Sequence, residues 1–313
     1  MHDRPGGPSD MLKSLFERHG TSGRWWLAAF ASLLALSAQA GDRFWPPIVD
    51  PPTGQHTPGR FVWGDLVTSD VAAAAEFYSK VFGWTFETYG GDDDRDTYTL
   101  ALADGLPIGG MVFDQRAMKG KTPSARWVGL ISVADVKAAA AAVSAAGGKV
   151  VYAPVVLGER GETAVFKDPE GVLFGVVHSK NGDPLDYAGD VNEWFWIDLW
   201  TADVEKAAAF YRAAIGYETV AIADDGPRSG VHLLSGGFAR GGIMQKRSPK
   251  ATPTWLPYIR VADAMAATRA AKAAGGKVVL EPLAMGRMTV GIIADPTGAP
   301  VGIVQVSGPE AQP

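Results

Sequence analysis

Two aspartates are the residues of this sequence best placed to do chemistry. Asp65 and Asp198 each stand two positions after a tryptophan, Trp63 and Trp196 respectively. Alternate residues of a β-strand share a face, so each carboxylate should lie beside its indole ring. A carboxylate is costly to bury without a partner. We therefore expect each one to face an open cleft, pair with a cation or accept N–H hydrogen bonds, and either is a candidate general base.

The same alternation extends the face on which each aspartate lies. Trp200 follows Asp198 in phase, and Tyr258 and Arg260 likewise share one face of a separate β-type run. Such rings combine a flat apolar surface with one polar group, which is typical of sites for planar or amphipathic organic molecules. The alternative is that the rings only fill space. The smaller companions expected around Asp65 are Val67, Val128, Leu130 and Ser132. The predicted ligand-binding residues are Trp63, Asp65, Trp196, Asp198, Trp200, Tyr258 and Arg260.

Composition argues against several other kinds of site. The chain has 313 residues and no cysteine, which excludes disulfides, iron–sulfur clusters, thiolate zinc sites and cysteine nucleophiles. His56, His178 and His232 lie far apart in the sequence, so we expect no metal and no other cofactor, and we assign His232 a structural role. A formal net charge of -5 argues against nucleic acid or an anionic membrane as the main partner.

An internal repeat shows which elements position these residues. Each copy contains a short strand, an aspartate, an alanine-rich helix and a glycine, followed by β-type runs that predict antiparallel hairpins. The four copies are Trp63 to Gly83, Val128 to Gly147, Trp196 to Gly216, and Leu256 to Gly275. Their aspartates are predicted helix N-caps: Asp70, Asp135, Asp203 and Asp263. Each unit is therefore β-α-β-β-β, and the predicted fold class is α+β.

Long-range offsets show that these units are duplicated in pairs. Trp63 and Asp65 recur 133 residues later as Trp196 and Asp198. The turn Asp168-Pro169-x-Gly171 returns as Asp295-Pro296-x-Gly298. The sequence thus predicts two consecutive modules, at residues 60–180 and 190–306.

This combination of strand, capped helix, Phe-Tyr pair and Asp-Pro-x-Gly turn resembles the vicinal oxygen chelate superfamily, in its glyoxalase and bleomycin-resistance branch. The resemblance covers residues 60 to 306 and implies two tandem modules, each with a cavity lined by its sheet. It also implies three metal-ligand positions per module, normally His, His and Glu. The residues at these positions are Trp63, Val128, Gly175, Trp196, Leu256 and Gly302. None supplies an imidazole or a carboxylate, so the resemblance does not imply a metal-dependent lyase or dioxygenase here.

The N-terminus has the pattern of a secretory signal. Residues 25–40 are uncharged, follow three basic residues and end in an A-x-A cleavage motif. The run is shorter than the roughly 20 apolar residues of a membrane span. We predict a cleaved signal peptide at 1–40, an extended Pro-rich linker at 41–59 in which Trp45 could pack on the following module, and a periplasmic or secreted protein that is a monomer or homodimer.

These observations predict an exported, metal-independent protein that binds a small aromatic or amphipathic molecule. One alternative is a metal-independent lyase or isomerase that uses Asp65 or Asp198 as base, with Tyr258 or Arg260 as an electrostatic partner. Another is a degenerate module that contacts other proteins. We expect the ligand in the second module, because more of the predicted aromatic residues lie there.

Overall fold

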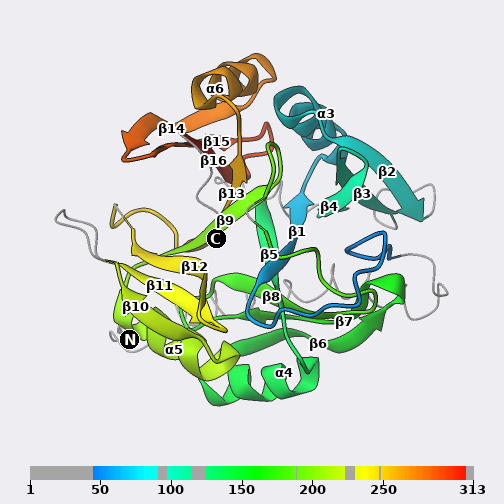
Figure 1. Cartoon of the computed structure of the whole chain (residues 1–313), viewed down its shortest axis with the longest axis vertical. Helices are drawn as coiled ribbons and strands as arrows, with labels where there is room; N and C mark the ends of the chain where they lie inside the picture. The colour runs from blue at the N-terminus through cyan, green and yellow to red at the C-terminus, as the bar shows by residue number, and fades with distance from the viewer. Residues whose placement is uncertain are drawn as a thin grey trace, which may run out of the picture. The chain divides into compact units, whose positions relative to one another are not determined.

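The computed structural model describes residues 45–90, 97–114, 125–187, 189–222, 230–246 and 248–307. The predicted signal peptide lies outside these residues. Within them the chain forms two eight-stranded sheets with four longer helices (Figure 1). This confirms the α+β class, the four β-α-β-β-β units and their arrangement as two tandem modules.

The first module contains two units that follow one another in the chain. The first unit consists of β1 (Phe61–Thr68), α3 (Val71–Phe82), β2 (Thr85–Gly90), β3 (Thr97–Ala103) and β4 (Leu106–Phe113). The second consists of β5 (Arg126–Ser132), α4 (Val136–Ala145), β6 (Lys149–Leu157), the single 3-10 turn η4 (Gly158–Arg160), β7 (Gly161–Lys167) and β8 (Leu173–Ser179).

The second module repeats this order without the 3-10 turn. Its first unit consists of β9 (Trp194–Thr201), α5 (Val204–Ile215), β10 (Glu218–Ala221), β11 (Gly230–Ser235) and β12 (Phe238–Gln245). Its second unit consists of β13 (Thr254–Arg260), α6 (Ala264–Ala273), β14 (Lys277–Met285), β15 (Met288–Ala294) and β16 (Pro300–Val306). Among the described residues, no helix has the length and apolar character needed to cross a membrane.

All four helices begin at their predicted aspartate caps. The Asp70 carboxylate accepts a hydrogen bond of 2.9 Å from the backbone N–H of Ala73, and the other three caps act in the same way. α3 and α5 end at Gly83 and Gly216, which adopt the left-handed conformation with φ of 73° and 87°. Glycine takes this conformation at little steric cost. These caps fix where the chain turns between strand and helix.

The two sheets have the same strand order. The first strands of the two units lie side by side and antiparallel, and each is flanked by the last strand of its own unit in parallel. The orders are β2-β3-β4-β1-β5-β8-β7-β6 and β10-β11-β12-β9-β13-β16-β15-β14. Because β1 and β9 are central strands, the Trp-Asp pairs lie in the middle of their sheets.

The modules pack together through their helices. α4 lies against α5, and α3 lies against α6 (Figure 1). Ile197 and Leu199 of β9 are buried in the core that contains α4 and α5. The alternating residues Trp196, Asp198 and Trp200 therefore point to the opposite side of the sheet. We call that side the helix-free face of the module.

Matched aromatic contacts hold the helices on the sheets. Tyr78 of α3 accepts a hydrogen bond of 2.7 Å from Nε1 of Trp127, and Tyr211 of α5 accepts one of 2.9 Å from Nε1 of Trp255. Both tyrosines are fully buried. The tyrosine of each Phe-Tyr pair thus packs its helix on the sheet.

A second matched contact joins the modules to each other. Thr68 donates to Oγ1 of Thr297 at 3.0 Å, and Thr201 donates to the carboxylate of Glu170. Glu170 and Thr297 both stand third in an Asp-Pro-x-Gly turn. Each module thus offers its turn to the threonine at the end of the other module's first strand.

Residues 45–59, the described part of the predicted linker, lie against the first module. Trp45 is 3% exposed and Ile48 is 1% exposed. The backbone N–H of Thr53 donates to the carbonyl of Asn181 at 3.0 Å, just after β8. This segment is therefore part of the packed module.

A buried carboxylate holds the end of this segment. Asp183, 1% exposed, accepts hydrogen bonds of 2.7 Å from the backbone N–H of Thr57 and 2.6 Å from the hydroxyl of Ser132. Beside it, the ring of His56 stacks on that of His178, with centroids 4.4 Å apart. The separation of these histidines in the sequence gave no sign of this contact.

Candidate ligand-binding site

The helix-free face of the second module brings together residues from three strands. Trp196, Trp200 and Tyr258 belong to one hydrophobic cluster. Tyr258 is buried, whereas the two tryptophans, Asp198 and His232 are partly exposed. We call these five residues the Trp196 site: Trp196, Asp198, Trp200, His232 and Tyr258.

Asp198 is the titratable centre of the Trp196 site. Its Oδ1 accepts a hydrogen bond of 2.8 Å from Nε1 of Trp196, and Tyr258 also hydrogen-bonds its side chain. Burial raises the pKa of Asp198 to about 6, against the opposing effect of these two hydrogen bonds. Gly242 makes room beside it, because a Cβ there would lie 2.4 Å from Oδ1. A carboxyl group with such a pKa exchanges its proton near neutral pH.

Two polar atoms of the Trp196 site are buried and have no hydrogen-bond partner among the described residues. They are Nε1 of Trp200 and Nδ1 of His232. Buried polar atoms are normally hydrogen-bonded, and an indole N–H acts only as a donor. A ligand oxygen near Trp200 would therefore gain a hydrogen bond that the described protein residues leave unmade.

His232, for which a structural role was predicted, lies in this site. Its ring meets that of Trp196 edge to face, with centroids 5.9 Å apart, and burial lowers the pKa of His232. His232 pairs with Gly242, and Gly242 pairs with Asp198 on the next strand. Only the strand register reveals this row across β11, β12 and β9.

Arg260, the predicted electrostatic partner of Asp198, makes a different hydrogen bond. Its Nη1 donates to the carbonyl of Gly189 at 3.2 Å, in the segment before β9. The neighbours that lower the pKa of Asp198 are Trp196 and Tyr258, both of which are neutral. Of the two partners predicted for Asp198, the structure brings Tyr258 to its carboxylate.

The first module carries the same Trp-Asp pair in a closed network. Nε1 of Trp63 donates to Oδ1 of Asp65 at 2.9 Å, and the Tyr98 hydroxyl donates to the same oxygen at 2.6 Å. Nη1 of Arg160 pairs with Oδ2 of Asp65 at 2.8 Å. Although burial alone lowers the pKa of Arg160, Asp65 and Tyr98 raise it, and it lies above its ordinary value. Asp65 therefore pairs with a cation, whereas the described hydrogen-bond partners of Asp198 are the neutral Trp196 and Tyr258.

Trp45 closes this network from the linker. Its ring lies 4.8 Å from that of Tyr98 between centroids. The Arg160 guanidinium lies 4.8 Å from the Trp45 ring and 5.3 Å from the Trp63 ring. Both distances are within the range of cation–π attraction. The buried cation is thus in contact with two indole rings.

The other residues expected around Asp65 are buried in the first module. Leu130 and Val128 of β5 pair with Trp63 and Asp65 of β1. Each is at most 4% exposed, and so is Val67. Together with Trp45 and Arg160, they leave this face closed.

The positions that the resemblance assigns to metal ligands offer no suitable donor here. A Cβ at Gly302 would lie 2.0 Å from Cδ1 of Tyr258, and one at Gly175 would lie 2.3 Å from Cδ2 of Leu130. In each module a neighbouring side chain therefore fills the space of the third ligand. Within the described parts of the chain, no group of three or more His, Asp or Glu residues could hold a metal ion. The residues present do not fit the metal that the resemblance implies.

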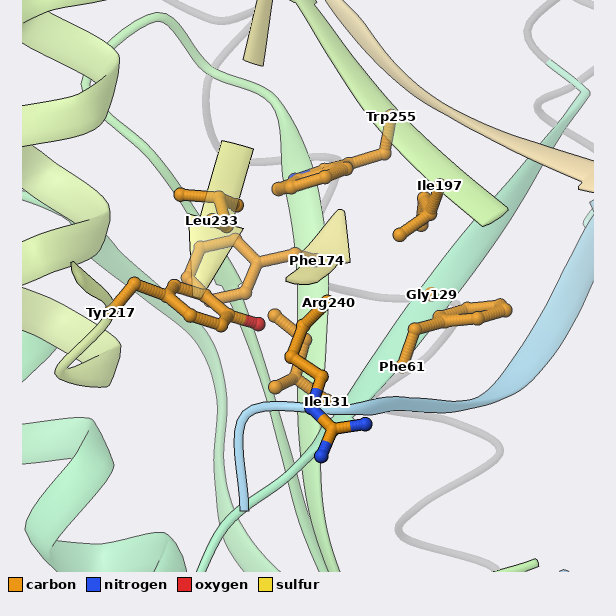
Figure 2. A pocket seen from close by; sticks show the side chains of 9 residues that line it. All are labelled: Phe61, Gly129, Ile131, Phe174, Ile197, Tyr217, Leu233, Arg240 and Trp255. Atoms are coloured by element: carbon orange, nitrogen blue, oxygen red, sulfur yellow. The ribbon is translucent and has the colours of Figure 1, made fainter. Parts of the chain in front are cut away.

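A crevice between the modules is too small to be the ligand site. Its interior is about 10 Å³, roughly the space of one water molecule. Figure 2 shows its mainly apolar lining, with the guanidinium of Arg240 pointing away from Trp255. Arg240 pairs with Asp186 at 2.8 Å. The lining residues are Phe61, Gly129, Ile131, Phe174, Ile197, Tyr217, Leu233, Arg240 and Trp255.

Each half of the chain matches the model of a known protein family. Residues 59–176 match the glyoxalase family described as the "Glyoxalase/Bleomycin resistance protein/Dioxygenase superfamily", and residues 194–304 match a family described as "Glyoxalase-like domain". These matches follow the two sheets of the structure.

Similar proteins cover the same part of the chain. "Anthracycline biosynthesis protein DauV" of Streptomyces sp. (strain C5) is 32% identical over 265 residues, which are 80% of this chain and 94% of that protein. "Putative glyoxylase CFP32" of Mycobacterium tuberculosis is 28% identical over 253 residues, 80% of this chain and 95% of that protein. Both align over nearly their whole length.

Solved structures share the fold at lower identity. A Mn(II)-bound glyoxalase from Novosphingobium aromaticivorans superposes with a TM-score of 0.57 at 19% identity, covering 80% of this chain and 83% of its own. The 2,3-dioxygenase LapB from Pseudomonas sp. KL28 gives 0.56 at 15% identity, covering 83% and 94%. These likenesses establish the shared fold.

Proposed function

Because this chain belongs to the glyoxalase/bleomycin resistance protein/dioxygenase superfamily, we propose that it is a metal-independent member whose second module binds a small planar or amphipathic molecule. The observation that carries this proposal is the Trp196 site. There, Trp196 and Trp200 are partly exposed, and the N–H of Trp200 is buried without a partner among the described residues. Flat apolar surface with a few unpaired polar atoms is typical of sites for organic ligands.

The chemistry of the Trp196 site limits the ligand. Stacking on Trp196 or Trp200 requires a flat ring, and the Trp200 N–H requires an acceptor such as a carbonyl oxygen. Asp198 disfavours an anionic group beside it above pH 6, where its carboxyl ionises. A neutral or cationic ring system that carries carbonyl groups meets these demands. The similarity to a protein named for anthracycline biosynthesis agrees with a planar ring system.

Nile red, a neutral planar dye whose fluorescence rises in apolar surroundings, tests this proposal. The wild-type protein should bind one equivalent, and Trp200→Ala should weaken binding by about 1–3 kcal/mol, the usual loss for a buried aromatic anchor. Val67→Ala is the matched control, since Val67 stands at the corresponding position of the first module. Equal losses in both variants, or none in a Trp200→Ala protein that is folded by circular dichroism, would contradict the proposal and favour a protein-contact role.

Metal independence has its own test. The proposal rests on the tryptophan, aliphatic and glycine residues at the six ligand positions. Elemental analysis of protein purified without added metal or chelator should find no stoichiometric Zn, Fe or Mn. One such ion per module would show that another ligand set exists in the chain.

A second candidate function is acid–base catalysis at Asp198. Its raised pKa of about 6 favours this role, because the carboxyl can both accept and return a proton near neutral pH. Mass spectrometry of small molecules that co-purify with wild type and with Asp198→Asn separates the two functions. A binding protein should carry the same compound in both variants, whereas an enzyme should carry product in wild type and accumulate substrate in the variant.

Export to the periplasm or medium completes the proposal. It rests on the basic, apolar and A-x-A segments of residues 1–40. The intact mass of the exported protein should correspond to a chain that begins at or near Gly41. A mass that includes residues 25–40 would rule out cleavage there.

A further inference from the structure

Trp45 is held on the first module mainly by side-chain contacts. It is 3% exposed, its ring lies 4.8 Å from that of Tyr98, and the Arg160 guanidinium lies 4.8 Å from its centroid. Its carbonyl also accepts a hydrogen bond of 3.1 Å from the backbone N–H of Glu159. An indole ring from outside the sheet thus lies against the helix-free face of the first module.

The surface beneath Trp45 corresponds to the Trp196 site. Trp63 and Asp65 match Trp196 and Asp198 at the offset of 133 residues. The indole N–H donates to the aspartate in both modules, at 2.9 Å and 2.8 Å. The first module thus places a ring of its own chain against Tyr98 and Arg160, which bind the aspartate of its pair, whereas the second module leaves its pair partly exposed.

We propose that the helix-free face of the first module is a second ring-binding site and that Trp45 is its tethered ligand. A neutral, electron-rich planar molecule the size of indole would take this place when Trp45 is absent. Electron-rich rings fit because the Arg160 guanidinium attracts their faces. Neutrality fits because Asp65 already pairs with that guanidinium at 2.8 Å, so an anionic ligand would compete with a buried carboxylate.

Trp45 can be replaced without disrupting the sheet, because the linker is also attached at other residues. Residues 53–57 are fixed separately, by backbone hydrogen bonds from Thr53 to Asn181 and from Thr57 to the Asp183 carboxylate. Trp45 lies outside both sheets, sixteen positions before Phe61, where β1 begins. Loss of its ring should therefore leave a space on the helix-free face while the helix-side cores stay intact.

The experiment measures indole binding by calorimetry to the full chain carrying Trp45→Ala in a Trp200→Ala background, which weakens the Trp196 site. One equivalent of indole should bind, and the melting temperature should rise with indole concentration. The same background with Trp45 intact should bind at least tenfold more weakly. This readout is independent of whether the second module binds Nile red, so the two proposals fail separately.

The matched control is Trp84→Ala in the same background. Trp84 is also fully buried and makes one hydrogen bond, to the carbonyl of Asn192 at 2.8 Å, but it lies in the helix-side core. No arginine among the described residues lies over the Trp84 ring. The indole-sized space left by its removal should therefore bind indole at least tenfold more weakly than Trp45→Ala.

Three results would overturn the proposal. The first is a Trp45→Ala protein that is folded by circular dichroism and does not bind indole. The second is equal binding by the Trp84→Ala control, which would mean that any indole-sized hole suffices. If Trp45→Ala does not fold, Trp45→Leu replaces it, and failure of both to fold would show that Trp45 is an ordinary core residue.

Discussion

The first and second modules contain the same Trp-Asp pair but satisfy its carboxylate in different ways. Asp65 pairs with Arg160 at 2.8 Å on a face that Trp45 covers. Asp198 accepts hydrogen bonds from two neutral side chains instead, and its pKa is raised to about 6. The comparison shows that a duplicated face stays partly exposed where the described residues provide neither a hydrogen-bonded cation for the carboxylate nor a ring to cover it.

The direction of one arginine accounts for much of this difference. Arg160 and Arg287 occupy the same position, since the carbonyl of each accepts a backbone hydrogen bond from the residue after the last strand of its module. Arg160 is 1% exposed and points to Asp65. Arg287 is exposed and donates to the carbonyl of Ser307 at 3.3 Å. The same residue type thus neutralises a buried carboxylate in one module and lies at the surface in the other.

The largest expected effect is the loss of this cation from the first module. Arg160→Ala leaves Asp65 buried and without its cation, which should lower the free energy of unfolding by about 3–5 kcal/mol. The measurement is urea denaturation at pH 7. Arg287→Ala, the matched change in the second module, should cost no more than about 0.5 kcal/mol. Similar losses in both variants would show that the two arginines have equivalent roles.

Substitutions of the glycines beside the two faces should differ less in their effect on stability than the two arginine substitutions. Gly302→Ala places a Cβ 2.0 Å from the Tyr258 ring, which must turn away from its position and release Asp198. Gly175→Ala places a Cβ 2.3 Å from a methyl group of Leu130, which can rotate away, and 3.3 Å from the carbonyl oxygen of Ala164. We expect a loss of stability of about 1–3 kcal/mol at Gly302, in the range of overpacked cores, and a smaller loss at Gly175. Thermal unfolding checks the order, and the opposite order would mean that Tyr258 is free to move.

The pH dependence of stability should separate the two aspartates. A carboxyl whose pKa is higher in the folded than in the unfolded protein stabilises the fold when protonated. This contribution is complete below about pH 4 and is lost as the pH rises through about 6. A shift of two units corresponds to roughly 3 kcal/mol, and partial exposure of Asp198 reduces this to about 1–2 kcal/mol. Between pH 4 and pH 7, the free energy of unfolding of Asp198→Asn should therefore rise by that amount relative to that of wild type.

The matched variant Asp65→Asn should be less stable than wild type at pH 7, because it removes the partner of the buried Arg160. Burial also raises the pKa of Asp168, to about 6, but Asp168 is present in all three proteins, so the difference between variants isolates Asp198. Denaturation curves at several pH values provide the test. A difference between Asp198→Asn and wild type that does not change with pH would show that Asp198 titrates normally.

The parts of the fold that local chemistry determines were predictable from the sequence. The four aspartate caps follow from a side chain that bonds a backbone N–H two or three residues ahead. The sequence also predicted that Trp196, Asp198 and Trp200 share a face, because strand alternation depends only on neighbouring residues. Because the two modules are sequence repeats, the same local assignments applied to both.

The contacts that close the first module were not predictable in this way. Arg160 comes from a 3-10 turn 95 residues away from Asp65. Trp45 was expected to be able to pack on the first module, but nothing in its Pro-rich segment indicated Tyr98 and Arg160 as its partners. The place of His232 beside Trp196 likewise depends on the register of β11, β12 and β9, which the sequence does not specify. Each of these contacts is long-range, and no local pattern specifies its partner.

The smallest expected effect tests whether the difference between the modules is confined to their helix-free faces. Thr68 and Thr201 are both fully buried, and each donates to the turn of the other module. Each hydroxyl also accepts a backbone N–H bond of 3.2 Å from its own cap aspartate. Thr68→Val and Thr201→Val remove matched contacts, so each should cost about 1 kcal/mol, and the two should agree within about 0.5 kcal/mol. Equal losses in the free energy of unfolding, measured by urea denaturation, would confirm that these two contacts between the modules are equivalent. A clear inequality would mean that the difference between the modules extends beyond their helix-free faces.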